Sequence, residues 1–124
     1  MYEPIRTKSV HAHGPHRSRQ EELDTRLAGH LTALLTVTDE LRALTPAAEL
    51  DAAGRRLVTE IERLTGHTPL RAEPTASAGT PAALHQRAHT LAGQALVVAT
   101  QRGDTAGAAL ASERMHAHAA ELEV

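Results

Sequence analysis

Histidine is the residue type in this sequence with the widest chemical use, because neutral imidazole binds transition metals and titrates near neutral pH. The chain contains nine histidines, and His85 and His89 are four residues apart, which places both rings on one face of a helix. Together with His118 they would give a metal three nitrogen ligands and leave a fourth position for water or for a histidine near the N-terminus. We therefore predict a site for a divalent transition metal (Zn²⁺, Ni²⁺ or Cu²⁺).

The same histidines also have simpler explanations. His89 lies off the apolar stripe of its expected helix and His85 lies at the edge of it, so both would also suit a solvent-exposed surface. His30 lies between Leu27 and Leu34 on an apolar face and is expected to be a hydrogen-bonded core or boundary residue. If His30 is buried and neutral, its protonation opposes folding, and stability should fall below about pH 6.

Signatures of catalysis are missing from the sequence. There is no glycine-rich phosphate loop and no Gly-x-Ser-x-Gly segment, and the paired carboxylates lie on polar helix faces that suit intrahelical ion pairs. Glu113 and His116 form one Glu-x-x-His element, which di-iron bundles carry twice together with two further inward-facing glutamates. We therefore expect no enzyme activity, no catalytic residue and no organic cofactor.

The apolar residues of the chain suit helices that pack closely together. The 124 residues make one domain with no Phe, no Trp and one Tyr, so Leu and Ala must build its core. The absence of cysteine excludes disulfides and thiolate chemistry. Twelve Arg against one Lys, with abundant Ala, is similar to the composition of small helical proteins from GC-rich bacteria, but no motif identifies a family.

Charge and hydropathy limit the partners that we expect. A formal net charge of −2 argues against nucleic acid, whose binding needs a basic surface. The longest apolar run, Ala95 to Ala99, is too short to span a bilayer, and the N-terminus has no apolar leader. We therefore expect a cytoplasmic protein without a membrane partner.

Four stretches of the sequence place apolar residues at steps of three and four, the spacing of an amphipathic helix. They predict helices over about 19–44, 46–65, 81–102 and 105–122, with a linker over 66–80. Residues 1–17 lack this periodicity and are expected to form a disordered, flexible arm before a helical domain over 18–124. Helix starts are predicted from four N-cap residues: Ser18, Thr45, Thr80 and Asp104. Two helix ends are predicted from the glycines Gly66 and Gly103.

The short connections at Thr45-Pro46 and Gly103-Asp104 predict two antiparallel helical hairpins. The expected fold is all-α, an antiparallel up-down-up-down four-helix bundle. The alternative is a pair of helical hairpins that is completed or extended by dimerisation. In the up-down-up-down order, six histidines gather at one pole of the bundle: His16, His67, His85, His89, His116 and His118.

Three apolar residues lie off the predicted stripes of the last two helices and form a candidate interface: Leu96, Val97 and Leu110. They favour a homo-oligomer or a protein partner. The leading functional hypothesis is therefore a non-enzymatic interaction or regulatory module. The rival hypothesis is a metal- or pH-responsive binding protein that uses the histidine-rich pole.

Overall fold

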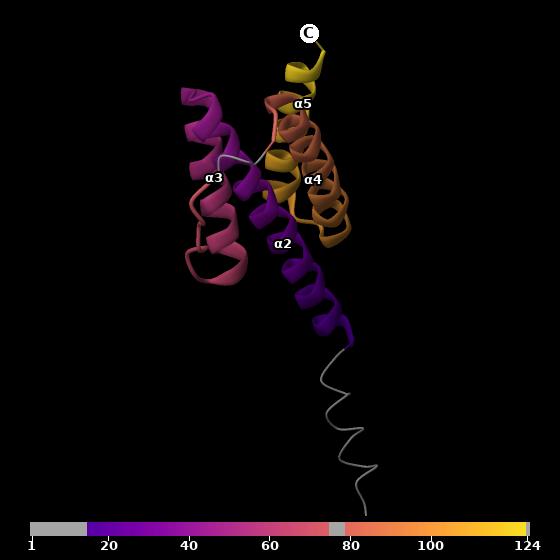
Figure 1. Ribbon diagram of the computed structural model, residues 1–124. Coiled ribbons are helices and arrows are strands. Elements are labelled where there is room, and N and C mark those ends of the chain that lie inside the picture. The colour runs from indigo at the N-terminus through magenta and orange to yellow at the C-terminus, as the bar shows by residue number, and fades with distance from the viewer. Residues whose placement is uncertain (1–14, 75–78, 124) are drawn as a thin grey trace, which may run out of the picture.

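The computed structural model of the protein describes residues 15–74 and 79–123, with side chains from Arg19 onward. Within these ranges the chain forms α-helices only, which confirms the predicted all-α class. The helices are α2 (Pro15–Leu44), α3 (Ala48–Thr65), α4 (Pro81–Arg102) and α5 (Thr105–Leu122), as Figure 1 shows.

Four of the predicted helix boundaries are confirmed by their cap geometry. The Thr80 hydroxyl accepts a hydrogen bond from the Ala83 amide at 3.1 Å at the start of α4. The Asp104 carboxylate accepts one from the Gly107 amide at 2.9 Å at the start of α5. Gly66 and Gly103 end α3 and α4 with φ of 83° and 77°, a left-handed conformation that glycine adopts without steric cost.

Two predicted caps are wrong. Ser18 lies inside α2, which already begins at Pro15 within the segment expected to be an arm; residues 1–14 lie outside the described residues. The amide and hydroxyl of Thr45 both donate to the Leu41 carbonyl, so Thr45 closes the end of α2 instead of starting α3. The N-cap of α3 is Ala47, which has no side chain able to cap the helix.

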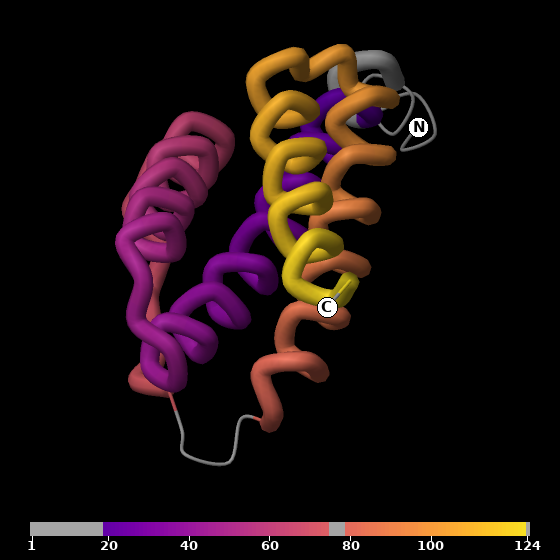
Figure 2. The backbone as a smooth tube through the Cα atoms, turned by 90° about the horizontal axis from the view of Figure 1, so that it is seen from above, coloured from indigo at the N-terminus to yellow at the C-terminus, as the bar shows by residue number. Residues whose placement is uncertain are grey.

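The helix directions differ from the predicted up-down-up-down order. Arg102 at the end of α4 bonds Asp24 near the start of α2 at 2.8 Å, so these two helices are antiparallel. Arg63 at the end of α3 bonds Asp104 at the start of α5 at 2.7 Å. In Figures 1 and 2, α2 and α5 accordingly run one way and α3 and α4 run the other way.

The linker between α3 and α4 is the physical reason for this difference. Its 15 residues over 66–80 can extend to about 50 Å, whereas α3 is only about 27 Å long. Residues 66–74 of the linker accordingly lie back along α3, toward the pole where α4 begins. Arg71 marks its path, because its guanidinium bonds the Asp39 carboxylate at 2.7 Å near the end of α2 and lies close to Gly54 of α3.

The core consists mainly of Leu and Ala, as predicted, and α2 contributes the largest share of it. On α5, however, the buried face is turned away from the predicted stripe, and its buried residues are Gly107, Leu110, Ala111, Arg114 and His118. Gly107 allows α5 to approach α2, since a Cβ there would lie 3.2 Å from Leu27 Cδ2. The prediction that Leu110 lies off the core face is therefore wrong: it is 7% exposed.

Candidate binding groove

An open groove lies between α3 and α5. Its larger part, about 690 Å³, lies between the first turn of α3, the start of α4 and the last turns of α5. A smaller part of about 280 Å³ continues between α3 and α5 beside Leu110. The ion pair of Arg56 with Glu113, at 3.2 Å, crosses from one helix to the other where the two parts meet. We call both parts together the α3–α5 groove.

A fully buried arginine, Arg114, lies at the base of the larger part. Its Nη1 donates to the Glu49 carboxylate of α3 and, at 3.3 Å, to the neighbouring Glu113. Its Nη2 lies 3.3 Å from Nε2 of His118, one helical turn further along α5. Its Nε has no hydrogen-bond partner among the described residues. Because an unpaired buried charge is very costly, these partners are what permit an arginine at this position.

The His118 ring lies between Arg114 and His85. Only 1% of His118 is exposed, and its Nδ1 lies 2.9 Å from Nδ1 of His85, with ring centroids 5.1 Å apart. A guanidinium only donates hydrogen bonds, so Nε2 of His118 must accept from Arg114. The proton of neutral His118 is then on Nδ1 and is donated to Nδ1 of His85, which leaves the His85 proton on Nε2.

This order of donors and acceptors fixes His118 in its neutral form at pH 7. Burial lowers the pKa of His118 to about 4, and the positive charge of Arg114 acts in the same direction, whereas Glu49 opposes the change only in part. A proton added at Nε2 would point at the Arg114 guanidinium and break the hydrogen bond between them. The network of Glu49, Arg114, His118 and His85 is therefore sensitive to a single proton.

Of the three predicted metal ligands, the structure brings two together. His85 and His118 are in contact, whereas His89, one turn further along α4, is half-buried and does not join them. Within residues 15–74 and 79–123, no group of three His, Cys, Asp or Glu side chains is arranged to hold a metal ion. Two imidazoles on a tetrahedral metal would have nitrogens about 3.3 Å apart, and a metal on Nδ1 of His118 would force the ring proton toward Arg114. Metal binding remains a prediction that this geometry does not favour.

The other histidines are spread over the molecule. His67 follows the end of α3, at the pole opposite His85 and His118, so the predicted gathering at one pole is wrong for it. His116 is exposed and its Nδ1–H donates to the Ser112 carbonyl at 2.8 Å. His30 is half-buried on α2, where burial and, less strongly, Arg26 lower its pKa. The side chain of His16 lies outside the described residues.

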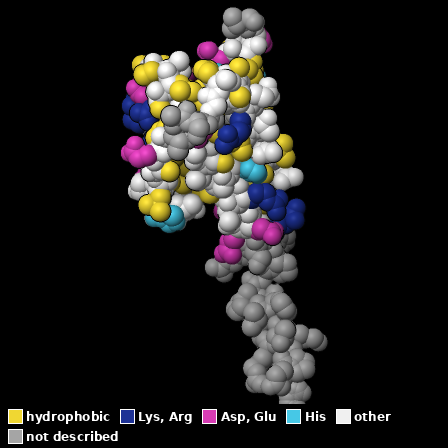
Figure 3. All heavy atoms as spheres, in the orientation of Figure 1, with side chains coloured by type: hydrophobic (Ala, Val, Ile, Leu, Met, Phe, Trp, Pro, Cys, Tyr) yellow, Lys and Arg dark blue, Asp and Glu magenta, His cyan; other side chains and the backbone are white. Residues whose placement is uncertain are grey.

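The candidate interface residues have three different environments. Val97 is 58% exposed on α4, Leu96 packs against the core while half-buried, and Leu110 is buried. On the face shown in Figure 3, basic, acidic and apolar side chains are interspersed over the described surface.

Sequence reasoning missed Arg114, the central residue of the groove. Its position four residues before His118 and four after Leu110 was the available signal, because 110, 114 and 118 share one helix face. We expected the α5 stripe to pass through Met115 instead, since an arginine is normally assigned to a polar face.

Comparison with known proteins gives no relative: no family model, no curated protein and no solved structure matches the chain. No helix within the described ranges has the length and apolar character needed to cross a membrane. Function must therefore be inferred from the residues of this chain.

Proposed function

We propose that this protein is a non-enzymatic, pH-responsive binding module whose binding site is the α3–α5 groove. The observation that carries the proposal is the neutral, fully buried His118, which accepts a hydrogen bond from Arg114 and donates one to His85. The network joins α5 to α4 through His85 and to α3 through Glu49, so its protonation state affects both walls of the groove.

The mobile wall of the groove is expected to be α3. This helix packs against α2 through its apolar stripe. It meets α5 through the side-chain pairs Glu49–Arg114 and Arg56–Glu113 near the groove and through Arg63–Asp104 at its far end. Glu49 and Glu113 are about half exposed, and separation of α3 from α5 would let water reach Arg114 as well, so these contacts separate at lower cost than a packed apolar face. We therefore expect α3 to move away from α5 while its contact with α2 is kept.

Acid favours the open groove because His118 binds a proton more tightly in that state. In an open state the His118 ring is hydrated and has a pKa near its ordinary value of 6.5, whereas in the closed groove its pKa is about 4. The open state then binds the proton more tightly at every pH between these values. Between pH 7.5 and 5 the ratio of open to closed molecules should rise by up to about thirtyfold.

A distance measurement between α3 and α4 tests this proposal. The chain has no cysteine, so spin labels at Arg55→Cys and Gln94→Cys, both exposed positions, report the two helices without interference. We expect a longer distance component that grows from pH 7.5 to 5. A distance distribution that does not change with pH would contradict the proposal.

His118→Gln is the matched control for the same experiment. The Gln side chain offers one acceptor and one donor, as neutral His118 does, but it does not titrate. We expect the longer component of this variant to be independent of pH. Acid opening that survives the substitution would assign the response to another group.

Self-association is a second candidate function, which the exposed Val97 and the half-buried Leu96 on α4 support. Light scattering over a range of concentrations tests it. A concentration-dependent mass that Val97→Asp abolishes is expected, and a monomer at all concentrations would remove this candidate.

A further inference from the structure

The α3–α5 groove has a marked excess of hydrogen-bond donors at its base. Hydrogen bonds run outward from the Arg114 guanidinium through His118 to His85. Arg114 only donates, whereas His118 and His85 each accept a hydrogen bond at one ring nitrogen and carry a proton on the other, so the unused polar positions are donors as well. They are Nε–H of Arg114, which has no partner among the described residues, and Nε2–H of His85.

The first turn of α3 adds further donors to the same groove. Ala47 and Leu50 line the groove, and the Ala47 cap leaves the first amides of the helix without a side-chain acceptor. A helix N-terminus alone would not identify a ligand. Here it lies beside a fully buried arginine with one unsatisfied donor, and the two features independently call for an acceptor that carries negative charge.

Glu49 provides such an acceptor within the protein itself. Its side chain is 56% exposed and extends from the first turn of α3 to the guanidinium of Arg114, which has no exposed side-chain surface. A long side chain that is more than half exposed can leave this position by changing rotamers. A carboxylate that arrives from solution offers Arg114 the same two oxygens in the same planar geometry.

We propose that the α3–α5 groove binds the carboxylate group of a small organic acid, which replaces Glu49 on Arg114. This inference rests on the proposed function and names the ligand class of that groove. A volume of about 690 Å³ is within the range of small-molecule sites. His85 and the first amides of α3 would hold the remaining oxygen lone pairs.

The charges around the groove favour a carboxylate over a phosphate. Glu113 and Glu121 also line it, and Glu113 is balanced by Arg56 at 3.2 Å. A monoanion that replaces Glu49 leaves the charge next to Arg114 unchanged. A dianionic phosphate would add a second negative charge beside these glutamates, so we expect it to bind more weakly.

Titration by NMR at pH 7.5 tests the proposal with two probes, sodium propionate and inorganic phosphate, against sodium chloride of equal ionic strength. The Arg114 Nε–H signal and the first amides of α3 report the groove directly. We expect propionate to shift these signals saturably with a millimolar dissociation constant, and phosphate to shift them less. Phosphate that binds more tightly than propionate would contradict the assignment to carboxylates.

Two matched variants separate a ligand site from a purely structural ion pair. Glu49→Gln removes the internal competitor and should strengthen propionate binding by about tenfold. Glu22→Gln, at an exposed position of α2 outside the groove, removes the same charge, leaves the Glu49–Arg114 pair intact and should change the affinity less than threefold. If Glu49→Gln folds but neither it nor the original chain shows a saturable shift, the pair is structural and the inference is wrong.

The pH response and the carboxylate site can fail independently. A groove that opens with acid in the spin-label experiment but does not bind propionate would overturn only the ligand assignment. Saturable propionate binding with distances that do not depend on pH would overturn the pH response and leave the carboxylate site in place.

Discussion

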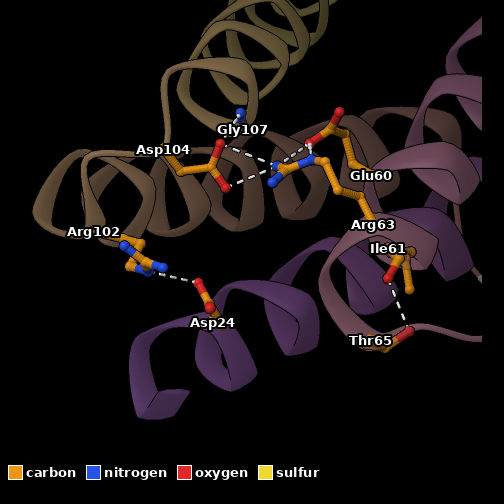
Figure 4. A network of polar contacts seen from close by, with 8 residues as sticks. All are labelled: Asp24, Glu60, Ile61, Arg63, Thr65, Arg102, Asp104 and Gly107. Atoms are coloured by element: carbon orange, nitrogen blue, oxygen red, sulfur yellow. Dashed lines mark hydrogen bonds and ion pairs between the residues drawn. The ribbon is translucent and has the colours of Figure 1, made fainter. Parts of the chain in front are cut away.

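The two ends of α3 are both tied to α5 by an arginine–carboxylate pair, but the two pairs have opposite surroundings. At one end, Arg63 is 44% exposed and bonds Asp104 at 2.7 Å as well as Glu60, and Figure 4 shows it lying between these carboxylates. At the other end, Arg114 has no exposed side-chain surface, and it shares its partner Glu49 with no other cation.

The arginine is the exposed member of the pair at one end and the buried member at the other. Arg102 and Asp24 form a further ion pair at 2.8 Å at the exposed end, visible in Figure 4, and water and salt can replace the exposed Arg63, although its partner Asp104 is only 9% exposed. At the buried end, Arg114 has only Glu49 and, at 3.3 Å, Glu113 as carboxylate partners, and a guanidinium without them would be an unpaired charge away from water. The same chemistry therefore gives redundant attachment at one end and sensitivity to a proton or a ligand at the other.

Truncation of the two arginines should give the largest contrast. We expect Arg114→Ala to lower the free energy of unfolding by about 3–5 kcal/mol, because it leaves a cavity and a buried imidazole without its donor. Arg63→Ala should cost less than about 1 kcal/mol. Urea denaturation followed by circular dichroism measures both values.

A third variant shows how much of the Arg114 effect is packing. Arg114→Met fills most of the same space without a charge and should recover part of the loss. The contrast between the two ends would be wrong if Arg63→Ala were as destabilising as Arg114→Ala.

As pH falls, stability should be lost first at the end of α3 that contacts Arg114, where His118 is buried. The pKa of His118 is lowered to about 4 in the folded protein from 6.5, so its contribution is fully present above pH 6.5 and is lost as pH falls to about 4. We expect a loss of up to about 3 kcal/mol over this range. Unfolding free energies measured from pH 7.5 to 4 test the prediction, and the curve of His118→Gln should be flatter.

The contribution of Asp104 to stability should be lost at lower pH than that of His118, and the loss should be smaller. Burial alone would raise its pKa, but hydrogen bonds from Arg63 and from the Gly107 amide outweigh burial and hold the pKa below 3.8. Its contribution is therefore constant down to about pH 4 and is lost as pH falls through the lowered pKa. Asp104→Ala should cost about 1 kcal/mol at pH 7, mainly as a lost helix cap.

Asp104→Asn separates the cap from the ion pair, because asparagine caps helices as well as aspartate does. Thermal melts should place this variant close to the original protein. An effect as large as that of Asp104→Ala would assign the stability of this end to charge instead.

Among these residues, His30 should contribute least to the pH dependence of the unfolding free energy. Its ring is only half-buried on α2, and burial followed by Arg26 lowers its pKa without fixing its proton in a hydrogen-bond series. His30→Leu should therefore remove only a minor part of the acid sensitivity between pH 6.5 and 5. A curve for this variant as flat as that of His118→Gln would move the pH response to His30.

The sequence predicts the helices of this protein well because their signals are local. The spacing of Leu residues and the caps at Thr80 and Asp104 depend only on neighbouring residues. The order of the helices is not local, since a 15-residue linker permits either direction for α4. The contact of His85 with His118 was partly predictable, because both lie near the pole formed by the start of α4 and the end of α5.

Arg114 could not be assigned to the core from its neighbours in sequence. A buried arginine is stable only through its partners, and Glu49 lies 65 residues away in the chain. The expected stripe through Met115 and the observed face through Arg114 differ by one residue, or about 100° around the helix. Tertiary pairing decided between them, and local periodicity does not report it.

The protonation state of His118 tests the central claim most directly. Long-range ¹H–¹⁵N spectra of the histidine rings distinguish a protonated Nδ1 from a protonated Nε2 and follow each ring as pH changes. We predict that His118 is neutral at pH 7.5, with its proton on Nδ1 and Nε2 as the acceptor from Arg114, and that the ring titrates well below pH 6.5. A ring that carries its proton on Nε2, or that titrates near pH 6.5, would contradict the account of the groove.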